Sequence, residues 1–231
     1  MFFPHVPYPK LVVVVRHGES EGNVRSHEER TAWEVSTNRY KLTDRGRAQC
    51  EITGAWLREH VPSPDRIVRS YYARTNETAA LLYPNAEIRE DELLAEKDGG
   101  IWAVRTIDQI RDQAPWELDR RERMGHYHYR PIGGENMPDV ETRVRAFRRS
   151  MRLHHTGKGS VVIVGHGHWI LLWRKRNEGF SIEETERRYQ EDEVAENASV
   201  LLYHNTWHPD GYFYLQHDPE VDYIIPWEGK L

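Results

Sequence analysis

The sequence contains only one cysteine, Cys50, so no disulfide bond can form within the chain. This composition suits a reducing compartment, and we expect Cys50 to be a small buried residue on a helix. No apolar run approaches the ~20 residues that a membrane-spanning helix needs. The first ten residues carry Pro4, Pro7 and Pro9 where a secretory signal would have an apolar helix. These absences lead us to expect a soluble, cytoplasmic protein without a membrane partner.

The sequence also lacks a large excess of either charge. It has 32 Lys and Arg against 37 Asp and Glu, a formal net charge of −5. Because nucleic-acid binding usually needs a strongly basic surface, we expect no nucleic-acid partner. The 231 residues contain no internal repeat, low-complexity segment or linker, so we expect a single domain over residues 1–231. The sequence gives no indication of the oligomeric state.

Short apolar segments alternate with amphipathic ones along the chain. Residues 11–15, 66–70 and 161–164 are rich in Val and Ile and predict buried strands. The segments 44–60, 73–82, 135–154, 169–177 and 182–192 predict helices, the first capped by Thr43. Residues 86–94 predict a strand and a turn, and 199–204 with 212–215 predict a terminal hairpin. This alternation predicts the α/β class, with three α/β/α layers around a mostly parallel central sheet.

Residues 97–134 interrupt this alternation. They contain few periodic apolar positions and are rich in Arg, Asp, His, Tyr and Trp, with short helical patterns at 106–113 and 116–124. Long polar insertions of this kind usually cover a functional site. We therefore expect residues 97–134 to be a helical and loop excursion over the substrate.

A histidine follows directly after each of the two most apolar predicted strands. His17 lies in Arg16-His17-Gly18-Glu19, and His166 in Gly165-His166-Gly167-His168. The glycine after each histidine allows the backbone to turn sharply and a ligand to approach closely. Ligands of open α/β sheets bind beyond the carboxyl ends of the strands, so we expect both imidazoles at one edge of the sheet.

Further motifs follow these two in an order typical of one family. They are Arg16-His17-Gly18-Glu19 with Asn23, Leu42-Thr43-Asp44-Arg45-Gly46, Ser70 with Arg74 and Thr78-Ala79, Glu96 ahead of Gly99-Gly100-Ile101-Trp102, Gly133-Gly134-Glu135-Asn136 with Asp139 and Arg143, and His166-Gly167. From about residue 11 to 204 the sequence resembles the histidine phosphatase superfamily, in the branch that includes cofactor-dependent phosphoglycerate mutases. The resemblance implies a phosphoglycerate mutase-like fold and phosphoryl transfer. Tyr71-Tyr72 departs from the Pro-Leu common after that serine, which leaves the local turn geometry open.

The residue types agree with phosphoryl transfer. A phosphoryl group in transfer carries charge on its equatorial oxygens, and Arg16 and Arg74 can donate forked, charge-assisted hydrogen bonds to them. Asn23 adds a neutral donor. By resemblance, the neutral imidazole of His17 attacks phosphorus and forms a phosphohistidine, while His166 and Gly167 bind the phosphoryl oxygens.

The resemblance assigns the general acid to Glu96, which would protonate the leaving oxygen and then activate water. Asp91, Glu92 and Asp98 are nearby alternatives. We prefer Glu96 because Leu94-Ala95-Glu96 precedes the Gly-Gly-Ile-Trp segment, as in the family pattern.

Three further readings concern residues around these motifs. His166 and His168 could suggest a metal site, but two histidines two apart on a turn present their rings poorly to one ion, so we expect neither metal nor cofactor. Ser70 could cap the helix that carries Arg74, whose N-terminal position favours anions. Arg120, Arg121, Arg123 and Arg130 could clamp an anionic substrate or form a solvated charged face, and the sequence favours neither.

Three functions remain in order of preference. The first is a metal-independent phosphomonoester hydrolase acting on a small phosphorylated metabolite. The second is a cofactor-dependent phosphoglycerate mutase, which is less favoured because mutases of this family have a longer excursion between the acid and the Gly-Glu segment. The third is a non-catalytic module that binds phosphate esters or a protein, which would not need His17 and Glu96 together.

Overall fold

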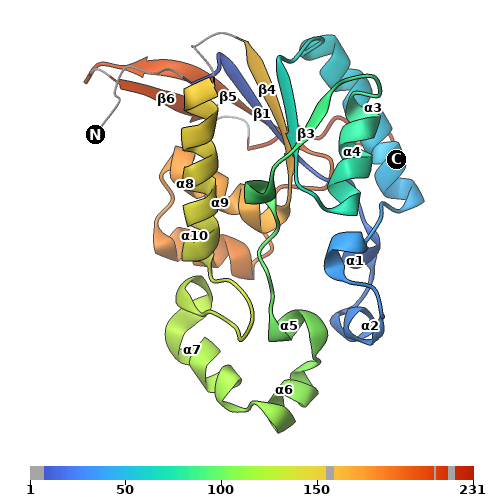
Figure 1. Cartoon of the computed structure of the whole chain (residues 1–231), viewed down its shortest axis with the longest axis vertical. Helices are drawn as coiled ribbons and strands as arrows, with labels where there is room; N and C mark the ends of the chain where they lie inside the picture. Colours follow the sequence, from blue (N-terminus) through green and yellow to red (C-terminus); the bar gives the residue numbers. More distant parts are fainter. Residues whose placement is uncertain (1–7, 155–158, 211, 218–221) are drawn as a thin grey trace.

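The computed structural model describes residues 8–154, 159–210, 212–217 and 222–231 of the chain. Its strands form one mixed sheet in the order β3-β2-β4-β1-β5-β6 (Figure 1). These strands are β1 (Leu11–Arg16), β2 (Arg66–Arg69), β3 (Ile88–Glu90), β4 (Ser160–Gly165), β5 (Val200–His208) and β6 (Tyr212–His217). The pairs β1/β4, β2/β4 and β2/β3 are parallel, whereas β5 and β6 are antiparallel to their neighbours. The predicted α/β class and mostly parallel sheet are confirmed.

Helices cover both faces of this sheet. They are α1 (Glu21–Val24), α2 (His27–Ala32), α3 (Asp44–His60), α4 (Ala73–Leu82), α5 (Ile101–Val104), α6 (Ile107–Gln113), α7 (Trp116–His128), α8 (Met137–His154), α9 (Gly167–Glu178) and α10 (Ile182–Gln190), with 3₁₀ turns η1 (Thr37–Arg39) and η2 (Glu92–Leu94). No described helix combines the length and apolar character that crossing a membrane requires. The expectation that the chain has no secretory signal used Pro4 and Pro7. Both residues lie outside the described part of the chain.

The central strands β1 and β4 are buried on both faces because their side chains alternate between two cores. Val13 and Val15 pack with Leu57 of α3 and Leu82 of α4. Val12 and Val14 pack on the opposite face, in the core that α8 and α9 complete. A continuous apolar run therefore suits these strands, since neither face meets water. The predicted apolar stripe of α8 lies in this second core: Val140, Val144, Phe147 and Met151 are all buried.

Local sequence fixes the helix that supports the first motif. The Thr43 side chain accepts a hydrogen bond from Gly46 N, so α3 begins at Asp44 as predicted. Gly46 is required here, because a Cβ on it would lie 1.9 Å from the Glu19 carbonyl oxygen. Thr43 N also donates to that carbonyl, at 3.0 Å. The Leu-Thr-Asp-Arg-Gly motif thus holds the start of α3 against the loop that follows β1.

The predicted cap of α4 is wrong. Tyr72, and not Ser70, precedes the first turn of this helix, and its side chain makes no capping hydrogen bond. Ser70 is buried two residues earlier in the chain, where its carbonyl oxygen accepts a hydrogen bond from Thr75 Oγ1. The helix still begins at Ala73, so Arg74 keeps its place in the first turn.

Residues 97–134 form a separate group of short helices beyond the sheet. In Figure 1, α5, α6 and α7 lie below the carboxyl ends of the strands. The predicted helical pieces correspond to α6 and α7, although α7 continues through a kink at Gly125, where φ is 69°. Helices α1, α2 and α5 were not predicted, because they are four to six residues long and too short to show a periodic apolar pattern.

Candidate active site

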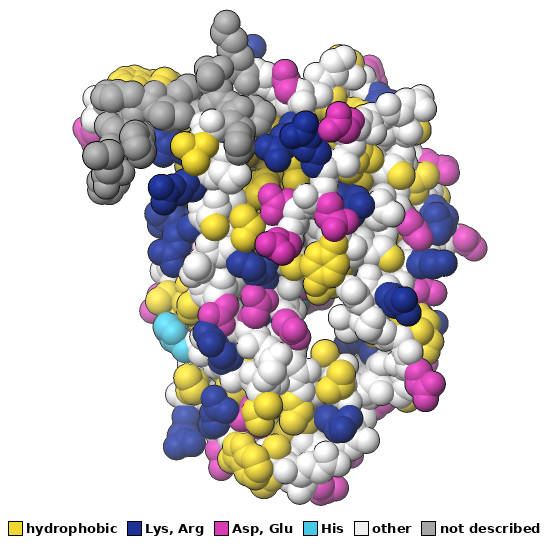
Figure 2. Space-filling view, in the orientation of Figure 1, with side chains coloured by type: hydrophobic (Ala, Val, Ile, Leu, Met, Phe, Trp, Pro, Cys, Tyr) yellow, Lys and Arg dark blue, Asp and Glu magenta, His cyan; other side chains and the backbone are white. Residues whose placement is uncertain are grey.

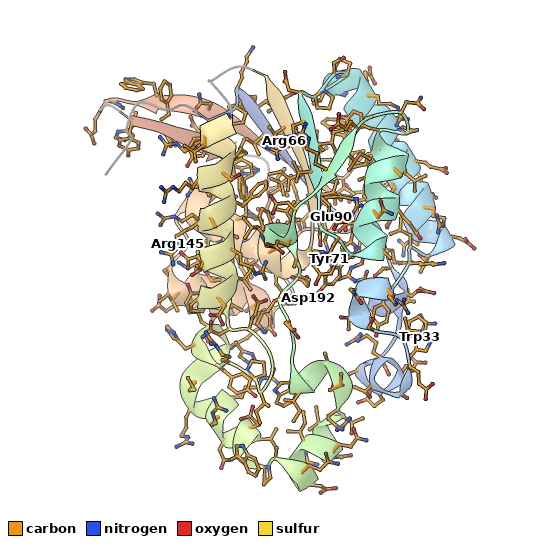
Figure 3. All side chains as sticks on the ribbon, viewed as in Figure 1. Trp33, Arg66, Tyr71, Glu90, Arg145 and Asp192 are labelled. Carbon is orange, nitrogen blue, oxygen red and sulfur yellow. The ribbon has the colours of Figure 1, made fainter. Side chains whose placement is uncertain are left out.

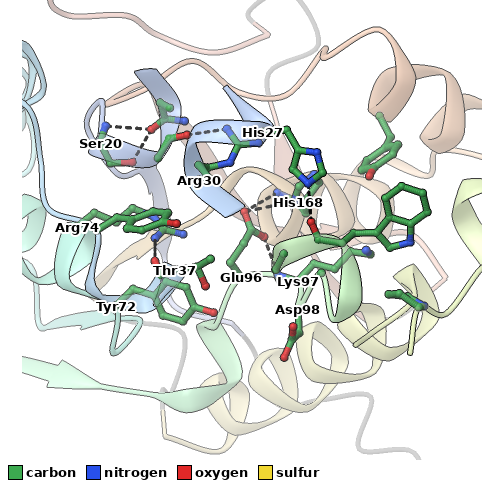
Figure 4. Close-up of a pocket in the computed structure, with 18 of the residues that line it drawn as sticks. Ser20, His27, Arg30, Thr37, Tyr72, Arg74, Glu96, Lys97, Asp98 and His168 are labelled. Atoms are coloured by element: carbon green, nitrogen blue, oxygen red, sulfur yellow. Dashed lines mark hydrogen bonds and ion pairs between the residues drawn. The ribbon is translucent and has the colours of Figure 1, made fainter. Parts of the chain in front are cut away.

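A pocket opens beyond the carboxyl ends of β1 and β4, between the sheet and the α5–α7 excursion. Its walls come from segments far apart in sequence: the end of β1, the α1–η1 segment, the start of α4, the loop after η2 and the start of α9 (Figure 4). Figure 2 shows the molecule hollowed at this level. The pocket lies where the sheet topology predicts a ligand site.

His17 lies at the base of this pocket, and its hydrogen bonds fix its tautomer. Its Nδ1 lies 2.7 Å from the Gly18 carbonyl oxygen, which can only accept, so Nδ1 carries the proton. Nε2 is therefore unprotonated, and its lone pair accepts a hydrogen bond from Arg74 Nε at 3.1 Å. Gly18 cannot be replaced easily, because a Cβ there would lie 2.5 Å from the Gly46 carbonyl oxygen.

The environment of His17 keeps its imidazole neutral. Burial, followed by the positive charge of Arg74, lowers the pKa of His17 well below its ordinary 6.5. The hydrogen bond to the Gly18 carbonyl opposes this effect only partly. A neutral imidazole with a free Nε2 lone pair is a nucleophile at neutral pH.

His166 lies beside His17, as the two strand ends predict. Their ring centroids are 5.2 Å apart, in an edge-to-face arrangement. His166 is completely buried, and neither of its ring nitrogens has a hydrogen-bond partner among the described residues. Burial and the charge of Arg74 lower the pKa of His166 well below 6.5, although Glu96 opposes them.

Two guanidinium groups complete this cluster. Arg74 reaches it from the first turn of α4, and its Nη1 is anchored on the Thr37 carbonyl oxygen at 2.8 Å. Arg16 is anchored on the Ala195 carbonyl oxygen at 2.5 Å, while its buried Nε has no described partner. Gly167 lies against Arg16, where a Cβ would be 3.6 Å from Arg16 Cζ. An added methyl group would make ordinary contact there, so close packing alone does not require this glycine.

Asn23 lines the pocket from α1. Its Oδ1 accepts hydrogen bonds from Ser20 N at 3.0 Å and Ser20 Oγ at 2.7 Å. Because the oxygen is occupied, the Nδ2 group remains to donate. The predicted role as a neutral donor suits this orientation.

Glu96 faces the same pocket from the loop after η2. Its Oε1 accepts a hydrogen bond from Lys97 N at 2.8 Å, and its Oε2 lies 3.4 Å from both the backbone N and the ring Nδ1 of His168. Burial would raise the pKa of Glu96, but His168, His166 and the Lys97 N–H together hold it well below 4.5. The carboxyl group is therefore ionised in the free protein, which suits a base better than an acid. Of the alternatives, Asp98 also lines the pocket, whereas Asp91 and Glu92 do not belong to its described lining.

The sequence reasoning missed the aromatic wall of the site. The Tyr72 ring packs 4.7 Å from the His166 ring, and Arg74 Cζ lies 4.7 Å from its centroid. Its neighbour Tyr71 lies outside the site, in a second hollow that Glu90 also lines (Figure 3). The departure from Pro-Leu at residues 71–72 was the signal that could have identified Tyr72.

Of the four arginines that the sequence singled out in the excursion, one belongs to the described lining of the pocket. Arg121 lines the pocket with its Cζ 4.6 Å from the Trp102 ring centroid. Arg120 pairs with Glu117, and Arg130 pairs with Asp139. Arg123 Nε donates to the Asp119 carbonyl oxygen and is absent from the described lining. Of the four, Arg121 therefore lies where a substrate clamp would need it, and the clamp itself stays a prediction.

Metal ligation has no candidate within the described ranges, where no group of three or more His, Cys, Asp or Glu side chains could hold an ion. The buried donors around His17 suit an anion instead.

Comparison with known proteins gives this geometry a context. A model of the histidine phosphatase superfamily, branch 1, matches residues 12–212. Phosphoglycerate mutase-like protein AT74 of Arabidopsis thaliana is 31% identical over 181 residues, which cover 69% of this chain and 54% of that protein. Phosphoserine phosphatase 1 of Hydrogenobacter thermophilus is 28% identical over 164 residues, covering 67% of this chain and 70% of that protein. The chain thus spans about half the length of the Arabidopsis protein.

Solved structures share the fold over almost the whole chain. The mycobacterial glucosyl-3-phosphoglycerate phosphatase in complex with VO3 superposes with a TM-score of 0.67 at 25% identity, over 90% of this chain and 97% of that one. The similarity therefore includes at least part of the excursion as well as the sheet, because the uncovered tenth of the chain is shorter than residues 97–134.

Proposed function

The chain belongs to branch 1 of the histidine phosphatase superfamily, and from that premise we propose that it is a metal-independent phosphomonoester hydrolase working through a phosphohistidine on His17. Its substrate is a small phosphorylated metabolite. Members of this superfamily transfer phosphoryl groups, and both phosphatase and mutase names occur among the relatives of the chain.

One observation carries the proposal: a buried nucleophile surrounded by buried donors. His17 Nε2 presents a lone pair, and His166 lies beside this ring with both of its own nitrogens unpartnered. Arg16, whose Nε is also unpartnered, lines the same pocket as His17. Leaving such groups unpaired costs on the order of 1–3 kcal/mol each, so they need a ligand that accepts several hydrogen bonds. The three equatorial oxygens of a phosphoryl group are such a ligand.

The first chemical step joins the substrate to the protein. His17 Nε2 forms a bond to phosphorus as the bond from phosphorus to the leaving oxygen breaks, and Glu96 delivers a proton to that oxygen. Arg16, Arg74 and His166 stabilise the charge on the equatorial oxygens. This stabilisation is effective because the donors are held in place before the reaction begins.

The second step releases phosphate. A water molecule forms a bond to phosphorus, the bond to His17 Nε2 breaks, and the Glu96 carboxylate takes a proton from the water. The ionised state of Glu96 suits this step, because a general base must be unprotonated. In the first step the same group must be protonated, so the negative charge of the entering phosphoryl group has to raise its proton affinity.

A phosphoglycerate mutase is the alternative, favoured by the AT74 resemblance. A mutase must keep water away from its phosphohistidine. The pocket here is open between the excursion and the sheet (Figure 2), which favours hydrolysis. A non-catalytic binding module remains the third possibility, but binding alone would not require both His17 and Glu96.

One assay separates the three functions. The purified protein is incubated in EDTA with a panel of phosphomonoesters that includes 3-phosphoglycerate, and free phosphate and isomerised product are measured. We expect phosphate release that survives EDTA and is lost in His17→Ala. Isomerisation without net release would identify a mutase, and phosphate binding without turnover would identify a binding module.

A further inference from the structure

The ionised state of Glu96 directs attention to His168, to which neither the motifs nor the proposed mechanism gives a role. His168 lies in the first turn of α9, two residues after His166. Figure 4 shows its ring facing the Glu96 carboxylate inside the pocket. Its backbone N donates a hydrogen bond to Glu96 Oε2 at 3.4 Å, and its ring Nδ1 lies at the same distance from that oxygen without hydrogen-bond geometry. His168 therefore contacts Oε2 of Glu96, whereas Lys97 N donates to Oε1.

The ring of His168 also connects this carboxylate with the outer part of the pocket. Its side chain is 38% exposed, whereas that of Glu96 is 17% exposed. Its ring centroid lies 5.2 Å from that of Tyr189 on α10, and Tyr189 lies 5.3 Å from His126 on α7. His168 thus has the carboxylate on one side and access to solvent on the other, as a group that exchanges protons with solvent requires.

Other charged and titratable groups face this pair from the surrounding elements. They are Arg16 from β1, His166 at the end of β4, Tyr189 from α10, Arg121 and His126 from α7, and Lys97 and Asp98 from the loop after η2. Among these, Arg16 and Lys97 are cations next to Glu96 and favour its carboxylate form. To act as the acid of the first step, Glu96 therefore needs a neighbouring group that supplies it with a proton.

We propose that His168 is the positioning and proton-sharing partner of Glu96, so that the pair, with one proton between its two groups, acts as the general acid. In the free protein the Glu96 carboxyl group is ionised. When a phosphoryl dianion enters, its charge raises the proton affinity of Glu96, and the proton passes from His168 Nδ1 to Oε2 and then to the leaving oxygen. The proton that Glu96 takes from water in the second step returns to His168. The inference rests on the proposed phosphohydrolase function.

The test compares two esters that differ in their need for an acid. Phenyl phosphate releases a phenol with a pKa of about 10, comparable to that of tyrosine, and needs protonation, whereas 4-nitrophenyl phosphate releases a far more acidic phenol. For His168→Gln we expect kcat/KM to fall at least about tenfold with phenyl phosphate and less than about threefold with 4-nitrophenyl phosphate. The alkaline limb of the phenyl phosphate profile should move to lower pH by about one unit or more, because Glu96 alone then holds the proton.

Two controls distinguish this role from a structural one. His128→Gln changes an exposed histidine of α7 that is absent from the described pocket lining, and it should leave the alkaline limb in place. The double variant Glu96→Gln/His168→Gln should be no slower with phenyl phosphate than Glu96→Gln alone, since His168 acts through Glu96. Thermal melting of each variant checks that the fold is retained.

Specific results would overturn the proposal. If His168→Gln slows both esters equally with an unchanged alkaline limb, or adds its full effect to that of Glu96→Gln, His168 does not share a proton with Glu96. A wild-type protein that hydrolyses neither ester and forms no phosphohistidine would instead overturn the proposed function, and this inference with it.

Discussion

At the scale of single residues, the carbonyl oxygen of Gly18 determines which nitrogen of His17 can react. A carbonyl accepts and cannot donate, so Nδ1 keeps its proton and Nε2 is left as the nucleophile. Arg74 donates to this lone pair in the free protein. The Arg74 guanidinium must shift toward the phosphoryl oxygens as the bond to phosphorus forms. It then donates to those oxygens instead of to His17 Nε2, and the nucleophile stays buried.

The buried histidines make the stability of the protein depend on pH. Burial holds the pKa of His17 and His166 below 6.5 in the folded state, so between that depressed value and 6.5 the unfolded chain binds more protons. The free energy of unfolding should therefore fall as the pH drops below 6.5, by at most about 1.4 kcal/mol per pH unit for each histidine. Urea unfolding at pH 7.0, 6.0 and 5.0 measures this slope.

His17→Gln is the control variant for this dependence of the free energy of unfolding on pH, because glutamine does not titrate. It should show a smaller loss of stability between pH 7 and 5 than the wild type. An equal slope in the two proteins would mean that His17 is not held neutral by the fold.

At the scale of elements, the sequence predicted most of the strands and long helices because each has a strong local signal. The four consecutive valines of β1 and the Thr43 cap of α3 are examples. The alternative that Ser70 caps α4 is wrong, because the helix begins at Ala73 and Tyr72 takes the N-cap position. The loop after β1 is determined by contacts between distant segments, such as those of Gly18 and Gly46, which a single sequence does not reveal.

Substitution of Gly46 tests the contact between α3 and that loop. A Cβ at this position would lie 1.9 Å from the Glu19 carbonyl oxygen, so Gly46→Ala must displace backbone. We expect a loss of about 2–4 kcal/mol in the free energy of unfolding, together with a fall in phosphatase activity as His17 moves. Chemical denaturation and the phosphate-release assay measure the two effects.

Gly165→Ala is the control for this substitution. Its Cβ would meet Trp169 at 3.5 Å, an ordinary contact, so its cost should stay below about 1 kcal/mol. If the two variants are equally stable, the close approach at Gly46 does not hold the loop.

At the scale of the whole molecule, the predicted site residues lie at one end of the sheet, and the excursion forms the opposite side of the pocket. His17, Arg74 and His166, which the sequence singled out, come together there, as do Arg16 and Glu96. Their chemical roles stay predictions. Tyr72 and Trp102 were not predicted as site residues, because their positions depend on how α4 and α5 pack around the pocket. The contact of His27 Nε2 with the Trp102 carbonyl oxygen, at 2.8 Å, joins α2 to α5 across 75 residues of sequence.

The excursion should determine how tightly substrate binds. Arg121 lines the pocket far from His17 in sequence and has no carboxylate partner among the described ion pairs. We expect Arg121→Gln to raise KM about fivefold to tenfold with little change in kcat, because the interaction is the same in substrate and transition state. Steady-state kinetics with the best ester of the panel measures both constants.

Arg123→Gln is the matched control, since Arg123 is exposed on the same helix and absent from the described lining. Its KM should equal that of the wild type. A comparable rise in KM for both variants would indicate a general effect of charge on the excursion instead of a contact with substrate.

Trapping the covalent intermediate tests the central claim most directly. The protein is mixed with a radiolabelled phosphomonoester, quenched in alkali within milliseconds, and the labelled peptide is identified by mass spectrometry. The account predicts an acid-labile, alkali-stable phosphoryl group on His17, formed as fast as turnover and absent in His17→Ala. Label on another residue, or turnover that continues without His17, would contradict it.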